Sequence, residues 1–205
     1  MSGLNDTITI ADGVAMPRFG LGVYRAGAGT YDAVRWALQA GYRHVDTARI
    51  YRNEEAVGRA LADEGASGVF VTTKLWNDDQ GYDETLRAFD ESVARLGVER
   101  VDLYLVHWPV EGRRLDSWRA MERILESGRA RAIGVSNFTV RHLEELLAVA
   151  NVRPAVNQVE LHPLLPQEAL VEFCREAGIV VEAYSPLAKG NCFDHPVIVL
   201  SLIHI

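Results

Sequence analysis

Short apolar runs alternate with longer amphipathic stretches along most of the chain, and this rhythm limits the possible folds more than any other feature. Seven runs predict strands: Gly20–Tyr24, His44–Thr47, Val69–Leu75, Val101–His107, Ala132–Ser136, Ala155–Glu160 and Ile179–Tyr184. Six stretches between them predict helices: Thr30–Ala40, Asn53–Glu64, Tyr82–Leu96, Leu115–Ser127, Val140–Ala150 and Gln167–Ala177. One helix between each pair of strands favours an α/β fold with parallel strands.

Two α/β architectures fit this rhythm, an open doubly wound sheet and a (β/α)8 TIM barrel. The open sheet usually carries a glycine-rich fingerprint after its first strand. Here that turn reads Gly20-Leu-Gly-Val-Tyr-Arg and lacks the third glycine. We therefore expect a barrel, preceded by a β-hairpin over Thr7–Arg18 that turns at Asp12-Gly13.

The predicted barrel is incomplete. Barrels of this type use eight strand–helix units and about 250 residues, whereas this sequence of 205 residues stops after the seventh strand. We expect residues 1–190 to form the barrel and residues 191–205 an atypical tail, the stump of a seventh helix. The first and seventh strands would then be open edges, which favour aggregation.

The composition is that of a globular enzyme. The chain is 48% hydrophobic, carries a formal net charge of −7 and has only two cysteines, Cys174 and Cys192. Scattered basic residues disfavour a nucleic-acid partner, and two cysteines are too few for a disulfide framework. No signal peptide and no apolar run of membrane-spanning length is visible, so we expect a cytoplasmic protein that does not bind membranes.

Polar residues stand at the carboxyl ends of several predicted strands, where barrels of this kind carry their catalytic groups. Asp46, Lys74 and His107 end three neighbouring strands, and Tyr51 follows in the loop after the second strand. Buried charges need partners, so we expect Asp46 and Lys74 to pair. An ammonium beside a phenol favours the phenolate, so the Tyr51 pKa should fall below its ordinary value of about 10. Such a group could donate a proton to a carbonyl oxygen that His107 orients.

Each of these residues also has a simpler interpretation. Asp46 and Lys74 alone could be a structural ion pair, His107 a core histidine and Tyr51 a loop aromatic; their convergence on one rim favours function. Trp76 and Trp108 fit the core or a pocket wall equally well, while Glu54 and Glu55 only favour the positive end of their helix. The sequence shows no metal motif, no nucleophile turn and no phosphate-binding loop.

Several segments, in this order, resemble the aldo-keto reductase family, and within it the bacterial 2,5-diketo-gluconate reductase-like branch. They are MPRFGLGVYRA, GYRHVDTARIYRNEEAVGRAL, FVTTKLWN, RVDLYLVHWP, RAIGVSNF, AVNQVELHP and EAYSPLAKG, and they extend over most of residues 7–190. The segment that follows in the family, which binds the cofactor's 2′-phosphate and adenine, is absent after Asn191, so the chain resembles a C-terminally truncated member.

The resemblance implies a role for each rim residue. Tyr51 would donate the proton, Lys74 would lower its pKa, Asp46 would hold Lys74, and His107 would orient the carbonyl. The cofactor, NADPH, would be held by Ser136, Asn137, Gln158, Tyr184, Ser185 and Leu187. The substrate pocket would be lined by Tyr24, Trp76, His107 and Trp108.

The sequence therefore predicts reduction of small aldehydes, keto-aldehydes or keto-sugar acids to alcohols, with NADPH as the hydride donor and a monomer as the form of the complete barrel. Two alternatives stay open at this point. One is a barrel that binds a nicotinamide cofactor without turnover, although such a sensor has no need of an acid. The other is an inactive truncated product.

Overall fold

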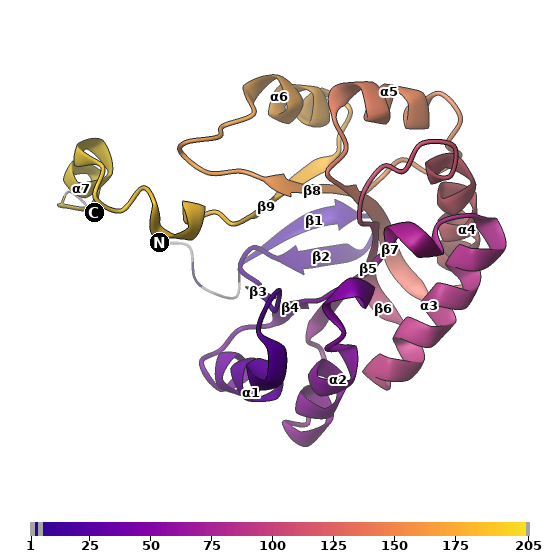
Figure 1. Ribbon diagram of the computed structural model, residues 1–205, viewed down its shortest axis with the longest axis horizontal. Helices are drawn as coiled ribbons and strands as arrows, with labels where there is room; N and C mark the ends of the chain where they lie inside the picture. The colour runs from indigo at the N-terminus through magenta and orange to yellow at the C-terminus, as the bar shows by residue number, and fades with distance from the viewer. Residues whose placement is uncertain (1–2, 4–5, 204–205) are drawn as a thin grey trace.

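Seven parallel strands, each followed by a helix, form most of a barrel, and a hairpin covers one end of it (Figure 1). The computed structural model describes residue 3 and residues 6–203. The strands lie in sequence order: β3 (Leu21–Gly22), β4 (His44–Asp46), β5 (Phe70–Leu75), β6 (Val101–Val106), β7 (Ala130–Ser136), β8 (Val156–Glu160) and β9 (Val180–Tyr184). The predicted (β/α)8-type barrel with seven strands present is confirmed.

Six helices cover the outside of the sheet, as the amphipathic stretches predict. They are α1 (Thr30–Gln39), α2 (Glu54–Asp63), α3 (Tyr82–Leu96), α4 (Arg114–Glu126), α5 (Val140–Leu147) and α6 (Glu168–Glu176). Their apolar faces pack on the outward-facing strand residues in one large core cluster, in which Trp118, Phe89 and Cys174 are buried. Their bounds agree with the sequence to within three residues.

The hairpin closes the end of the barrel where the strands begin. Strands β1 (Thr7–Ala11) and β2 (Val14–Pro17) pair antiparallel. Ile10, Val14 and Met16 pack inside the barrel on residues near the strand starts, including Phe70 and Leu103. The amino-terminal end of the barrel is therefore filled with apolar side chains, and the opposite rim stays accessible.

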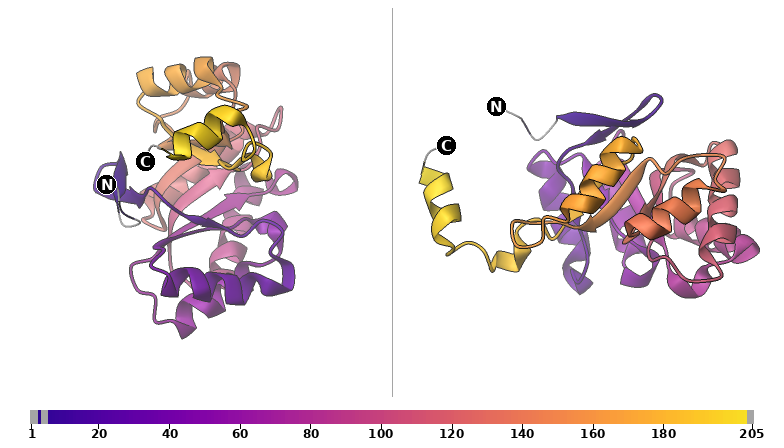
Figure 2. Two further views of the ribbon diagram at one scale, coloured as in Figure 1. Left: turned by 90° about the vertical axis from the view of Figure 1, so that its left-hand side faces the viewer. Right: turned by 90° about the horizontal axis from the view of Figure 1, so that it is seen from above.

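The sheet does not close on itself. In the described residues β3 pairs only with β4, and β9 pairs only with β8, so both carry an unpaired edge. The tail forms helix α7 (Pro196–Ile203), which lies away from the barrel (Figures 1 and 2). The last two tail residues, 204–205, lie outside the described residues. No helix in the part of the chain described is both long and apolar enough to cross a membrane.

Candidate active site

Asp46, Lys74 and Tyr51 meet at the carboxyl-terminal rim of the barrel. The Lys74 Nζ donates to Asp46 Oδ1 at 2.5 Å and to the Thr47 carbonyl at 3.0 Å. Lys74 is 1% exposed, so its charge is compensated by these two oxygens, and the predicted ion pair is confirmed. Parallel pairing of β4 with β5 and of β5 with β6 aligns the strand ends that carry these groups.

Tyr51 approaches this pair from the short 3-10 turn Arg49–Tyr51. Its half-buried ring lies with the centroid 5.4 Å from Lys74 Nζ and 5.7 Å from the His107 ring, which it meets edge-on. The four side chains therefore share one environment, which is the arrangement that the proposed proton donor requires.

The pKa of Tyr51 is raised, and the expectation that it falls is wrong for this structure. Burial raises the pKa of the phenol above its ordinary value of 10.0, and the Lys74 ammonium lowers it by less than burial raises it. Burial also lowers the pKa of Lys74, but the charges of Asp46 and Tyr51 outweigh burial and leave it raised. At neutral pH the site thus holds an ammonium and a phenol that keeps its proton.

His107 is a neutral imidazole at the same rim. Burial and the nearby Lys74 charge lower its pKa from 6.5 to about 3. The side chain is buried against Trp76, with the ring centroids 5.3 Å apart, and its Nδ1 has no hydrogen-bond partner in the described structure. A neutral ring can donate one hydrogen bond to a carbonyl oxygen without adding a positive charge.

Four of the six residues expected to hold the cofactor bond to one another or to the residues described above. The Asn137 Nδ2 donates to Ser136 Oγ and to the His107 carbonyl, both at 3.0 Å, and the Tyr184 hydroxyl donates to Asn137 Oδ1 at 2.9 Å. The Gln158 Nε2 donates to Asp46 Oδ2 at 2.9 Å. Amide groups of this kind match both the donors and the acceptor of a carboxamide.

Accessibility separates these six residues into two groups. Ser136 and Gln158 are buried, whereas Asn137, Tyr184 and Ser185 are half-buried and Leu187 is 62% exposed. Asn137 and Ser185 have φ values of 63° and 50°, which turn the chain sharply at the ends of β7 and β9. The buried pair supports the rim from below, and the other four residues lie at its surface.

Aromatic side chains lie near Tyr51 and His107 at the rim. Tyr24 lies with its ring centroid 5.1 Å from that of Tyr51, and Trp108 follows His107 in the chain. Tyr24 and Trp108 are 62% and 43% exposed, whereas Trp76 is half-buried. Such exposure fits side chains that line a pocket, in the case of Tyr24 and Trp108. Trp76 borders the site through its ring contact with His107.

Glu54 has a structural role that its position at the start of a helix does not predict. This residue is 1% exposed and accepts hydrogen bonds from Thr73 at 2.6 Å and Arg95 at 2.7 Å, so it ties α2 to β5 and α3. Its neighbour Asn53, also buried, accepts from Thr47 and donates to the Val23 carbonyl. These two residues fix the start of α2 directly after the Tyr51 turn. A Glu at a helix start gives no sign of this, because its partner Arg95 lies 41 residues away.

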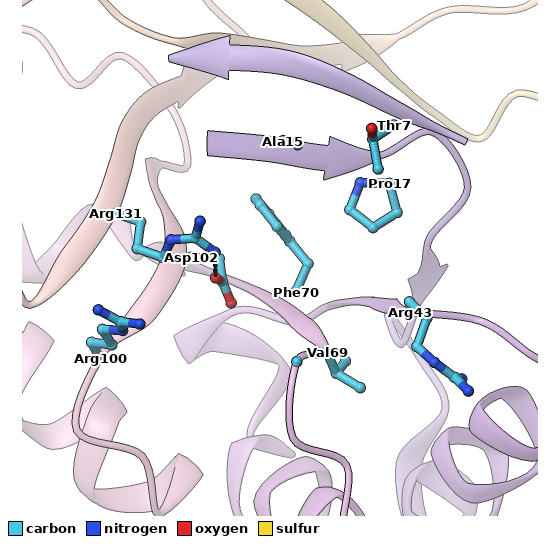
Figure 3. Close-up of a pocket in the computed structure, with 10 residues that line it drawn as sticks. Thr7, Ala15, Pro17, Arg43, Val69, Phe70, Arg100, Asp102 and Arg131 are labelled. Atoms are coloured by element: carbon cyan, nitrogen blue, oxygen red, sulfur yellow. Dashed lines mark hydrogen bonds and ion pairs between the residues drawn. The ribbon is translucent and has the colours of Figure 1, made fainter. Parts of the chain in front are cut away.

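A separate cavity of about 430 Å³ lies at the other end of the barrel, between the hairpin and the starts of the strands (Figure 3). Two of its three arginines have structural contacts: Arg131 binds Asp102 and the Gly13 carbonyl, and Arg43 donates to the carbonyls of Leu38 and Tyr42. Figure 3 shows the Phe70 ring pointing toward the hairpin and the Arg43 side chain pointing away. The cavity is thus the space that remains where the hairpin packs against the barrel.

Comparison with known proteins agrees with this geometry. Residues 20–195 match the model of the aldo/keto reductase family. The chain belongs to the aldo/keto reductase family. It is 52% identical over 188 residues to the 9,11-endoperoxide prostaglandin H2 reductase of Trypanosoma cruzi, covering 90% of this chain and 66% of that protein. It is 48% identical over 201 residues to the glyoxal reductase of Bacillus subtilis, covering 96% of this chain and 73% of that one.

Two solved structures of a similar protein, Gox0644, share the fold. Apo Gox0644 superposes with a TM-score of 0.93 at 44% identity, over 98% of this chain and 74% of that one. A substituted form of Gox0644 in complex with NADPH superposes with a TM-score of 0.92 at 43% identity, over the same shares. The chain therefore spans roughly two thirds to three quarters of the length of these family members.

Proposed function

We propose that this aldo/keto reductase chain carries the site of an NADPH-dependent reductase that converts small aldehydes and ketones, including keto-aldehydes and keto-sugar acids, to alcohols. The observation that carries the proposal is the contact between a protonated Tyr51, the Asp46–Lys74 pair and a neutral His107. The glyoxal reductase activity named for the Bacillus subtilis relative and the NADPH bound to the substituted Gox0644 support it.

Tyr51 is the proton donor in this proposal. The bound nicotinamide would supply the hydride, and the protein would supply position and charge. As negative charge grows on the carbonyl oxygen, Tyr51 releases its proton to that oxygen and the Lys74 ammonium stabilises the phenolate left behind. His107 holds the oxygen by one hydrogen bond, and Asp46 keeps Lys74 in place.

Asn137, Tyr184, Ser185 and Leu187 would contact the cofactor at the rim. Their half-buried or exposed side chains, next to the donor and acceptor groups of Ser136 and Gln158, fit a flat ring with a carboxamide. Tyr24, Trp76 and Trp108 would border the carbonyl compound. Cytoplasmic location and a monomeric complete barrel belong to the same proposal.

The test is reduction of glyoxal by the purified chain with NADPH, followed by the loss of NADPH absorbance. Tyr51→Phe should lower kcat by about a hundredfold or more, because it removes the proton and keeps the ring. NADPH binding, measured by quenching of tryptophan fluorescence, should change little. Tyr82→Phe, on the exposed face of α3, is the matched control and should follow the wild type.

Two outcomes would contradict the proposal. Turnover by Tyr51→Phe at the wild-type rate would remove Tyr51 from the acid role. NADPH binding by the wild type with no oxidation for glyoxal or any other small carbonyl compound would instead favour a barrel that binds the cofactor without turnover.

A further inference from the structure

One carboxyl group lies inside the barrel beneath the candidate site, and the proposed mechanism gives it no role. Glu182 stands in the middle of β9, two residues before Tyr184. Alternate residues of a strand face the same side, and Val180, two residues earlier, packs with the apolar cluster inside the barrel. The Glu182 side chain therefore points into the barrel. The residue as a whole is half-buried, and its Oε2 is buried and has no hydrogen-bond partner in the described structure.

Glu182 is connected to the Asp46–Lys74 pair through one side chain. The register of β8 and β9 places Gln158 opposite Glu182. The Gln158 Nε2 donates to Asp46 Oδ2 at 2.9 Å, and the register sets the Glu182 side chain next to the same Gln158 side chain on the inner face of the sheet. A single amide thus lies between two carboxyl groups, and one of these holds Lys74.

The ionisable groups facing Glu182 come from β4 and β5. Asp46 and His44 lie on β4 and Lys74 lies on β5, while the uncharged Thr72 of β5 binds the His44 Nε2 at 2.9 Å. Burial raises the pKa of Glu182, as does the Asp46 charge, whereas His44, the Gln158 amide and Lys74 lower it; the pKa is raised overall. Glu182 therefore keeps its proton to a higher pH than an ordinary carboxyl.

We propose that Glu182 is a positioning residue for the reduction: its side chain lies against the Gln158 amide that binds Asp46, and so helps to hold the Asp46–Lys74 pair against Tyr51. The inference rests on the proposed function. A neutral Glu182 leaves Asp46 as the single carboxylate next to the ammonium. An ionised Glu182 adds a second carboxylate that attracts the same ammonium and the same amide. Lys74 then stabilises the Tyr51 phenolate less well, and turnover falls.

The decisive variant is Glu182→Gln, which mimics the protonated acid in shape and charge. With NADPH and glyoxal at low pH, its kcat should equal that of the wild type to within about twofold. As the pH rises, the kcat of the wild type should fall further than that of Glu182→Gln, because only the wild type ionises at residue 182. Glu182→Leu should lose about tenfold in kcat at low pH, because an apolar side chain replaces the polar neighbour of the Gln158 amide. Glu176→Gln, an exposed carboxyl on α6, is the control and should follow the wild type.

A second measurement needs no activity. The folded chain holds a proton on Glu182 that the unfolded chain releases above pH 4.5. The unfolding free energy of the wild type should therefore fall, relative to Glu182→Gln, as the pH rises from 4.5 toward the folded pKa. Urea unfolding across this range measures the difference.

Different results overturn different claims. If the wild type turns over and the pH profile of Glu182→Gln is identical to it, or if Glu182→Leu keeps the wild-type kcat, the positioning role is wrong and the proposed function stands. If the wild type oxidises no NADPH with any carbonyl compound, the proposed function fails and the positioning role fails with it. Parallel unfolding curves would show that Glu182 is not a buried protonated acid.

Discussion

At the scale of single residues, the site depends on side chains whose protonation is set by burial. Lys74 keeps its charge because Asp46 and the Thr47 carbonyl surround the ammonium. Tyr51 keeps its proton and His107 stays neutral, because burial penalises a phenolate and an imidazolium alike. The buried site therefore contains one compensated ion pair and two neutral groups that can form hydrogen bonds.

The neutral His107 has a measurable consequence for stability. Between pH 6.5 and about 3 the unfolded chain binds a proton on this residue and the folded chain does not. Its contribution to the free energy of unfolding is therefore lost as the pH falls through this range, with a slope of up to about 1.4 kcal/mol per pH unit. His107→Gln, which keeps a hydrogen-bonding side chain, should remove this contribution. Urea unfolding between about pH 4 and pH 7 tests this, and parallel curves for the two proteins would contradict a buried neutral imidazole.

Sequence reasoning located the four central residues because parallel strands bring their carboxyl ends to one rim. It gave the wrong direction for the shift of the Tyr51 pKa. The sequence shows that Lys74, which lowers this pKa, lies near Tyr51, but it does not show how deeply the ring is buried, and burial raises the pKa by more. It also gave no role to Glu182. The signal was present, since Glu182 interrupts the apolar run Ile179–Tyr184, but the face it occupies follows only from the register of the sheet.

At the scale of elements, helices α2 and α3 approach so closely that one of them needs a glycine. A Cβ on Gly58 of α2 would lie 2.3 Å from the Leu96 carbonyl oxygen and 2.6 Å from its carbon. Both are backbone atoms at the end of α3, so they cannot turn aside as a flexible side chain could. The Glu54–Arg95 ion pair joins the same two helices, and together these contacts hold the helix that begins behind the Tyr51 turn.

Gly58→Ala should therefore destabilise the protein despite the better helix propensity of alanine. Replacing glycine by alanine within a helix raises the free energy of unfolding by up to about 1 kcal/mol. Overpacking lowers it by about 1–3 kcal/mol. The net effect should therefore be a loss of about 1 kcal/mol in the free energy of unfolding. Gly22→Ala is the matched control, because a Cβ there has no atom within 4 Å. Thermal unfolding compares the two variants; an unchanged or higher Tm for Gly58→Ala would show that α2 and α3 can separate at no cost.

At the scale of the whole molecule, the sheet has two unpaired edges. β3 contributes only two residues, whereas β9 offers five, Val180–Tyr184. The N–H of Val180 donates to the Ala155 carbonyl, directly before β8, and successive residues of a parallel strand point their amides in opposite directions. The amides of Val181 and Ala183 therefore face the open edge, and such an edge can pair with another chain. The sequence predicted these edges correctly from the strand count alone.

The chain should consequently associate as its concentration rises. Ala183→Lys places a charge on the exposed part of this edge and should reduce association, as lysines do on natural edge strands. Light scattering after size-exclusion chromatography measures the effect over a concentration series. Glu176→Lys, on neighbouring α6, adds a lysine away from the edge and should associate like the wild type. A monodisperse wild type at every concentration would contradict the expectation.

The hairpin has a kinetic consequence for the proposed reaction. Ile10, Val14 and Met16 fill the end of the barrel where the strands begin, so small molecules do not reach Lys74 from that end. In the proposed reaction the cofactor and the carbonyl compound both bind at the opposite rim, so their binding is expected to be ordered. The one that lies deeper enters first and leaves last, and we expect the nicotinamide nucleotide to precede the carbonyl compound and to depart after the alcohol.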